Sequence, residues 1–223
     1  MAQQVLSIER QQVRQLRLNY LRYLPDGYDQ DAASPWPLML FLHGAGERGD
    51  DLEQIKNHGI PKVLETRDLP FVVLSPQCPP DSWWSDYLPA LDGLIAESLA
   101  TLNVDPRRVY LTGLSMGGFG TWHMAVEYPQ RFAAIAPICG GGPWMYGVYQ
   151  RLEAIRHLPT WVFHGAKDDI VAPAESQRMV ERLQELGGNV CFTLYPDADH
   201  NSWEATYNNP MLFDWFLAHK KAA

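Results

Sequence analysis

The order of apolar and polar residues along the chain predicts a sheet whose strands alternate with helices. From Val13 to Leu24 apolar and polar side chains take turns, which is typical of a half-exposed antiparallel strand at a sheet edge. Further along, short apolar runs lack this alternation, as expected of strands buried on both faces of a parallel sheet. These runs cover residues 38–42, 71–74, 109–112, 133–138, 160–163 and 190–195.

Helical periodicity appears between several of these runs, at residues 87–102, 116–127, 174–186 and 211–220. Strands that alternate with helices imply right-handed crossovers, helices on both faces of the sheet, and a functional crevice at the carboxyl ends of the strands. We therefore predict one α/β domain over residues 1–223, with a mostly parallel twisted sheet and an antiparallel N-terminal edge. No segment between motifs is long enough for a large lid domain.

Composition narrows the class of protein. A formal net charge of −8 without a dense Lys/Arg run argues against a nucleic-acid or anionic-membrane surface, and no apolar run approaches a membrane span. No secretory or transit segment is visible at the N-terminus, which favours the cytoplasm. The three cysteines are widely spaced and are expected to be reduced thiols, and no two histidines have metal-ligand spacing on one element. We expect no metal, no cofactor and a small-molecule substrate; a homodimer is compatible with the sequence.

A G-x-S-x-G motif at Gly113–Gly117 carries the candidate nucleophile, Ser115. The bare motif arises by accident in roughly one chain of this length in fifteen, so the flanking elements decide whether it marks a nucleophile. Here it lies between the apolar run that ends at Thr112 and the start of a helical pattern. Such a strand–turn–helix elbow exposes the serine on a strained turn, with the positive end of the helix aimed at the reacting centre.

Two backbone N–H groups are candidates for an oxyanion hole, those of Ala45 and Met116. Ala45 belongs to the glycine-rich segment after residues 38–42, which resembles the H-G loop that supplies such a donor in esterases. His43 in the same loop is expected to be a structural hydrogen-bonding residue rather than a base. Glu47 and Arg48 are expected to form a solvated pair or to line the pocket, with the pair favoured.

Chain order assigns the base and its acid, because hydrolases with this elbow place Asp or Glu after the serine and His last. His200 follows an apolar run in a loop, whereas His219 lies at the end of the last helical pattern and is expected at the surface. Asp168 and Asp169 both follow residues 160–163. We favour Asp168 as the acid and keep Asp169 as the alternative. A neutral His200 is required for proton transfer, so kcat/KM should rise from about pH 6 to 7.5.

The chain resembles esterases of the dienelactone-hydrolase, phospholipase/carboxylesterase and polyhydroxybutyrate-depolymerase-like branch of the α/β-hydrolases. The resemblance rests on FLHGAGERG, SPQCP followed by WW, GLSMGGFGTW, FHGAKDDIVAP and DADHNSWEATY, which lie between Leu38 and Phe216. It implies an α/β-hydrolase fold and aligns Asp168 with the family's triad acid. The sequence departs at Ala172, where some relatives carry Pro. It also departs at Ser115, because dienelactone hydrolases proper use Cys.

We therefore predict a serine carboxylesterase that acts on small, short-chain or aromatic esters through an acyl-enzyme. Alternatives are a serine peptidase or amidase on the same triad and a non-catalytic binding protein on a hydrolase scaffold. Aromatic residues in loops after the strands are expected to rim the substrate pocket, although packing onto the core explains them equally well. These pocket candidates are Trp83, Trp84, Trp144 and Trp203.

Overall fold

The computed structural model describes residues 4–10, 15–30, 33–142 and 147–222. In this part of the chain one seven-stranded sheet has the order β1-β3-β2-β4-β5-β6-β7. The pairing of β1 with β3 is antiparallel, and the pairings of β2 through β7 are parallel. The strands are β1 (Asn19–Tyr23), β2 (Trp36–Leu42), β3 (Val72–Gln77), β4 (Val104–Leu114), β5 (Ala134–Ile138), β6 (Thr160–Gly165) and β7 (Val190–Tyr195).

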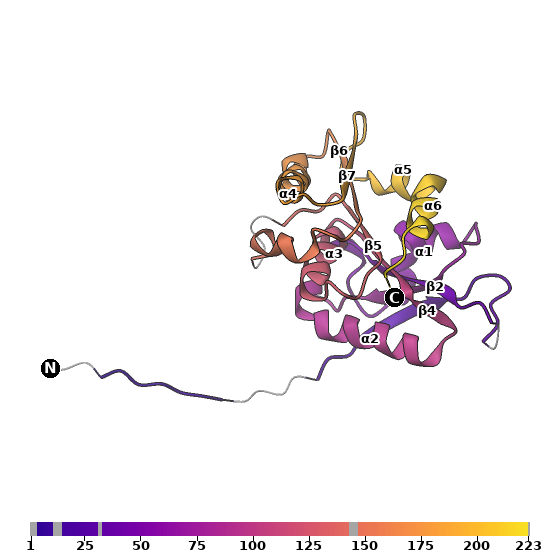
Figure 1. Cartoon of the computed structure of the whole chain (residues 1–223), viewed down its shortest axis with the longest axis horizontal. Helices are drawn as coiled ribbons and strands as arrows, with labels where there is room; N and C mark the ends of the chain where they lie inside the picture. The colour runs from indigo at the N-terminus through magenta and orange to yellow at the C-terminus, as the bar shows by residue number, and fades with distance from the viewer. Residues whose placement is uncertain (1–3, 11–14, 31–32, 143–146, 223) are drawn as a thin grey trace.

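Helices pack on both faces of this sheet (Figure 1). Side chains of β2 alternate between two apolar clusters: Leu40 belongs to the cluster that includes residues of α2, α3 and α4, and Phe41 to the cluster that includes residues of α1, α5 and α6. This alternation is the two-residue period of a strand that is buried on both faces. The α-helices are α1 (Gly59–Leu64), α2 (Leu88–Thr101), α3 (Met116–Glu127), α4 (Pro173–Glu185), α5 (Trp203–Asn208) and α6 (Pro210–Ala218).

Short 3₁₀ helices lie in the loops between these elements: η1 (Ala45–Glu47), η2 (Leu52–Asn57), η3 (Trp84–Asp86) and η4 (Tyr149–Ile155). Residues 4–10 extend away from the folded body (Figure 1). No described helix combines the length and the apolar character that a bilayer crossing requires.

The predicted fold class is confirmed, including the antiparallel edge strand, with differences in detail. The expected edge strand over 13–24 is shorter: β1 begins at Asn19, and residues 13 and 14 lie outside the described part. The expectation that residues 190–195 are buried on both faces is wrong. Strand β7 is half-buried or exposed because it is an edge strand with β6 as its neighbour. Strand β4 starts five residues earlier than the run 109–112, since Pro106 and two arginines interrupt its apolar pattern.

Candidate active site

The backbone at Ser115 adopts a conformation that non-glycine residues rarely take. Ser115 stands between β4 and α3 with φ 51° and ψ −116°. Its N–H donates to the carbonyl oxygen of Ile138 at 3.0 Å, which anchors the turn to β5. Such a left-handed residue costs of order 1–3 kcal/mol and persists where the surroundings hold it, often at functional sites.

Glycines make this tight turn compatible with its neighbours. A Cβ atom at Gly117 would lie 1.9 Å from the carbonyl oxygen of Leu42, and one at Gly113 would lie 2.4 Å from the carbonyl oxygen of Gly117. Both distances are shorter than any tolerated contact with backbone. The elbow can therefore approach the end of β2 only without side chains at these two positions.

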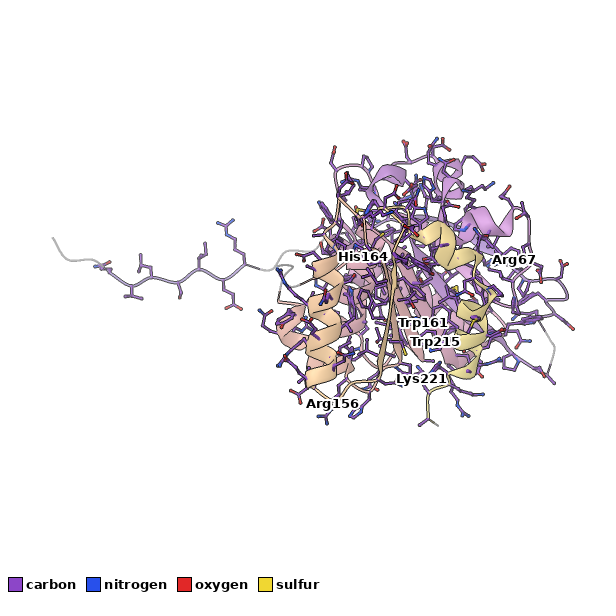
Figure 2. All side chains as sticks on the ribbon, turned by 90° about the horizontal axis from the view of Figure 1, so that it is seen from above. Arg67, Arg156, Trp161, His164, Trp215 and Lys221 are labelled. Carbon is purple, nitrogen blue, oxygen red and sulfur yellow. The ribbon has the colours of Figure 1, made fainter. Side chains whose placement is uncertain are left out.

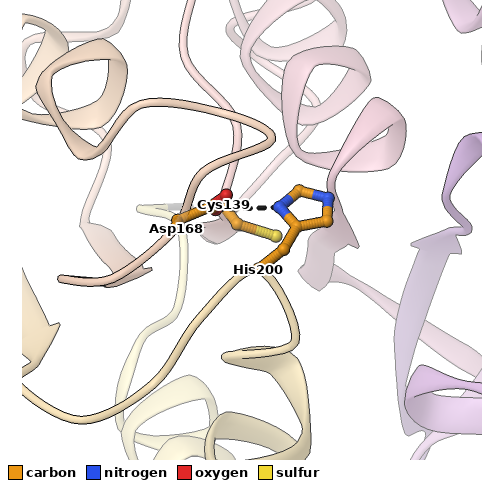
Figure 3. Close-up of side chains that lie close together, drawn as sticks. All are labelled: Cys139, Asp168 and His200. Carbon is orange, nitrogen blue, oxygen red and sulfur yellow. Dashed lines mark hydrogen bonds and ion pairs between the residues drawn. The ribbon is translucent and has the colours of Figure 1, made fainter.

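Three side chains from separate loops form a hydrogen-bonded row. Nε2 of His200 lies 2.9 Å from Oγ of Ser115, and Nδ1 of His200 lies 2.8 Å from Oδ2 of Asp168. The Asp168 side chain is fully buried, whereas that of His200 is 18% exposed. Figure 3 shows Asp168 and His200 approaching each other from loops that follow β6 and β7. This arrangement can move a proton from the serine to the imidazole while the carboxylate fixes the tautomer.

Of the two adjacent aspartates, the structure turns Asp168 inward and Asp169 outward. Oδ1 of Asp168 accepts the N–H groups of Ile170 and Val171 at 3.0 and 2.9 Å, so the loop wraps around its own carboxylate. Asp169 is exposed. The contact to His200 is therefore made by the aspartate that the sequence favoured.

A second histidine contacts the same carboxylate, and the sequence analysis missed it. His164 is fully buried, and its Nε2 lies 3.0 Å from Oδ2 of Asp168. Figure 2 labels His164 inside the molecule, with α4 on one side and α5 and α6 on the other. The signal was available, because His164 lies at the end of a buried strand four residues before the candidate acid.

Both candidate oxyanion donors lie at the N-terminus of a helix. Ala45 is the first residue of η1 and Met116 the first residue of α3, so neither N–H has a partner within its own helix. The two loops are in contact, since a Cβ atom at Gly44 would lie 3.7 Å from Cβ of Ser115. This geometry can present N–H groups to negative charge that develops next to Ser115.

Buried hydrogen bonds hold the loop that carries Ala45. His43 accepts the N–H of Cys78 at Nε2 (2.9 Å), and its Nδ1 lies 2.6 Å from the carbonyl oxygen of Gly44. Burial lowers the pKa of His43 to about 4, so the ring is neutral and can accept and donate at once. The predicted structural role of His43 agrees with these contacts.

The expected surface pair of Glu47 and Arg48 is wrong. Glu47 is 7% exposed, its Oε1 lies 3.7 Å from Nε2 of His58, and burial raises the pKa of its carboxyl. Arg48 donates instead to the carbonyl oxygens of Ala45 and Ser82, at 3.0 and 3.3 Å. The first turn of η1 points Glu47 toward the protein, so the two neighbouring side chains diverge.

The aromatic pocket candidates occupy different environments. Trp203 packs edge-to-face on His200 with 5.3 Å between ring centroids, and Trp83 is 43% exposed with the Arg48 guanidinium 5.9 Å from its ring. The expectation that Trp84 rims the pocket is wrong: it is 1% exposed and its indole N–H donates to the carbonyl oxygen of His43 at 3.0 Å. Trp84 therefore supports the loop that carries Ala45 from the protein interior. Trp144 lies outside the described residues.

A thiol also lies near the row. Ligand atoms of Cys139, Asp168 and His200 all fall within 4.8 Å of one another. A metal would need a thiolate and a free imidazole nitrogen, but burial raises the pKa of the Cys139 thiol and His200 Nδ1 already bonds Asp168. This donor set fits a metal poorly. The described cysteines, Cys78, Cys139 and Cys191, are free thiols, and Cys191 is exposed.

The remaining late histidine takes no part in this row. His219 follows α6, where its Nδ1 lies 2.7 Å from the carbonyl oxygen of Trp215 and its ring packs on that indole. It is half-buried rather than at the open surface. These contacts belong to the end of the last helix.

Comparisons with known proteins find similarity to several ester hydrolases. Residues 80–209 match the model of the phospholipase/carboxylesterase family. The chain is 27% identical to a poly(3-hydroxyoctanoate) depolymerase of Pseudomonas fluorescens (84% of this chain, 75% of that one) and 26% identical to a probable carboxylesterase of Oryza sativa subsp. japonica (91% and 85%). The solved structure of a thermostable esterase superposes with a TM-score of 0.78 at 35% identity, over 92% of this chain and 60% of that one.

Proposed function

We propose that this chain, which belongs to the phospholipase/carboxylesterase family, is a serine carboxylic-ester hydrolase that works through Ser115, His200 and Asp168. Membership in the family and the esterase relatives establish a hydrolase that acts on esters. The observation that carries the finer proposal is the continuous row of hydrogen bonds from Ser115 Oγ through both nitrogens of His200 to Asp168.

In this proposal catalysis proceeds through an acyl-enzyme. His200 Nε2 takes the proton of Ser115 as Oγ attacks the ester carbonyl carbon, and the resulting imidazolium is stabilised by Asp168. Collapse of the tetrahedral intermediate breaks the ester C–O bond, and His200 gives its proton to the departing alkoxide. Water then attacks the acyl group on Ser115 with His200 again as base, which releases the acid and restores the hydroxyl.

The N–H groups of Ala45 and Met116 are proposed to stabilise the oxyanion of both tetrahedral intermediates. Removing one such donor in a serine protease costs about 2.7–4 kcal/mol of transition-state stabilisation. The loop of Ala45 is held by buried contacts of His43 and Trp84, so the donor is fixed before substrate binds. A fixed donor needs no reorganisation during the reaction.

A small or aromatic ester fits the surroundings of the proposed base best. Trp203 packs edge-to-face on His200, and Trp83 is an exposed aromatic side chain near Arg48 in the loop after β3. Aromatic and apolar walls favour apolar or aromatic groups over charged ones. We propose short-chain or aromatic esters on this basis, and the natural acyl and alcohol parts are left to experiment.

A fluorophosphonate probe and p-nitrophenyl esters test the proposal together. Wild type is expected to hydrolyse p-nitrophenyl acetate or butyrate and to gain one adduct, mapped by peptide mass to Ser115. Ser115→Ala is expected to lose both. Ser82→Ala is the matched control, because Ser82 is half-buried and its hydroxyl makes only a long contact, 3.4 Å, with the carbonyl oxygen of Pro80.

Other outcomes would favour the alternatives. Turnover of peptide amides that is lost in Ser115→Ala would indicate a serine peptidase or amidase on the same residues. A folded wild type without an adduct and without turnover would contradict the proposal and favour a binding protein on a hydrolase scaffold. Activity unchanged in Ser115→Ala would assign the nucleophile elsewhere.

A further inference from the structure

We propose that His164 is a positioning residue for the reaction: its Nε2–H donates to Oδ2 of Asp168 and thereby sets the orientation and the effective charge of the carboxylate that faces His200. This inference rests on the function proposed above. It concerns a group that does not touch Ser115 or the substrate. His164 acts through Asp168, at the same carboxylate oxygen, Oδ2, that His200 contacts.

The contacts of His164 fix which ring nitrogen carries the proton. Nε2 lies 3.0 Å from Oδ2 of Asp168 and 2.9 Å from the carbonyl oxygen of Val171, and both of these atoms are acceptors. A bare Nε2 would face two lone pairs, so the proton belongs on Nε2. Nδ1 lies 2.7 Å from Oγ of Ser176. The carbonyl oxygen of Gly140, 2.9 Å from the same hydroxyl, also accepts the indole N–H of Trp122, so the single Ser176 proton is available to donate to Nδ1. The ring is thereby satisfied at both ends without a net charge.

The neutral state matters for the proposed chemistry. Burial lowers the pKa of His164, which favours the uncharged ring. A charged His164 would compensate Asp168 and would repel the imidazolium that forms on His200. A neutral N–H instead orients the carboxylate and leaves most of its negative charge to stabilise that imidazolium.

With His164 included, the carboxylate of Asp168 receives four hydrogen bonds. Oδ1 accepts the backbone N–H groups of Ile170 and Val171, and Oδ2 accepts from His164 and from His200. Four is about the acceptor capacity of a carboxylate. Both oxygens of the carboxylate are therefore held, and without the His164 donor Oδ2 is held by His200 alone.

The charged and titratable groups around this carboxylate come from several elements. His164 lies near the end of β6, His200 precedes α5, and Cys139 follows β5 within 4.8 Å of Asp168. Helix α4 contributes the hydroxyl of Ser176, which also lies 2.9 Å from the carbonyl oxygen of Gly140. The thiol of Cys139 is uncharged because burial raises its pKa. A pH effect in His164 variants therefore reports on His200 and Asp168.

Substitutions of His164 by two amide side chains and by methionine distinguish its role as a hydrogen-bond donor from its role in packing. In the variant His164→Gln, the amide nitrogen can occupy the place of imidazole Nε2 and donate to Asp168. In His164→Asn the shorter side chain places its amide near the position of Nδ1, facing Ser176. His164→Met fills similar volume with no donor. All three variants remove the imidazole, so only the donor to Asp168 distinguishes the glutamine variant from the others.

The experiment measures kcat and KM for p-nitrophenyl butyrate between about pH 5 and 9, with thermal unfolding of each variant. His164→Gln is expected to keep kcat within about threefold of wild type and to keep its acid limb. His164→Asn and His164→Met are expected to lose about tenfold or more in kcat, with KM little changed, as a hydrogen bond to a charged group is removed. Their acid limb should move to higher pH, because a less compensated Asp168 stabilises protonated His200.

Equal losses in folded His164→Gln and His164→Met, or wild-type rate and acid limb in His164→Met, would overturn the proposal. Nitrogen NMR of ¹⁵N-histidine-labelled wild type tests it even where the Met and Asn variants do not fold. A neutral ring with the proton on Nε2 is expected, and a bare Nε2 would overturn it. A wild type that neither turns over ester nor labels would contradict the proposed function, whereas the tautomer of His164 would still be measured.

Discussion

Lowering the pH should destabilise the protein through His43, the buried histidine under the candidate oxyanion loop. Its pKa is about 4 in the folded chain, against about 6.5 in an unfolded one. A depressed pKa means that the unfolded state binds the proton first, so this stability is present above pH 6.5 and is lost as the pH falls toward 4. Between pH 7 and pH 5 the loss from His43 alone is about 1.8 kcal/mol.

Urea unfolding of wild type and His43→Gln at both pH values isolates this contribution. The variant keeps an acceptor for the N–H of Cys78 but cannot titrate, so it should be less stable at pH 7 and lose about 1.8 kcal/mol less than wild type on going to pH 5. Other titrating groups, including His164 and His123, whose pKa values burial also lowers, contribute to both proteins and cancel. Equal losses in the two proteins would refute the reasoning.

Three substitutions test other parts of the site. Asp168→Asn should lower kcat by up to about 10⁴-fold, the size seen when the triad acid of a serine protease becomes Asn, whereas Asp169→Asn should stay near wild type in the same ester assay. Gly117→Ala would place a Cβ atom 1.9 Å from the last carbonyl oxygen of β2 and should abolish fluorophosphonate labelling and lower the Tm. Trp84→Phe removes the donor to the carbonyl oxygen of His43 and should cost about 2 kcal/mol in urea unfolding.

The central elements were predictable because their signals are local. Helix α3 coincides with the predicted 116–127, and α2, α4 and α6 begin and end within two residues of prediction. Helices α1 and α5 were missed because six residues are too few for a helical period to stand out. The exposure of β7 was missed because the position of a strand in the sheet depends on pairings far apart in sequence.

In the site as well, features with local sequence signals were predicted and features that depend on long-range contacts were missed. Chain order and motif context named Ser115, Asp168 and His200, which the structure places in hydrogen-bond contact, and their catalytic roles stay a prediction. The position of His164 at the end of β6, four residues before the acid, could have placed it near Asp168, but their hydrogen bond also depends on the turn that brings the acid back beside this strand. The burial of Trp84 likewise depends on a long-range partner, the loop after β2.

The two halves of the candidate catalytic row differ in mechanical support. Ser115 lies between β4 and α3, in the best-buried part of the sheet. His200 lies in the loop that follows β7, an edge strand with one neighbour. Local opening proceeds most readily where few buried contacts resist it. Local unfolding of β7 would move the imidazole of His200 away from Ser115 while the serine elbow remains folded. A loss of enzymatic activity would therefore report local unfolding at this edge of the sheet while the rest of the protein is still folded.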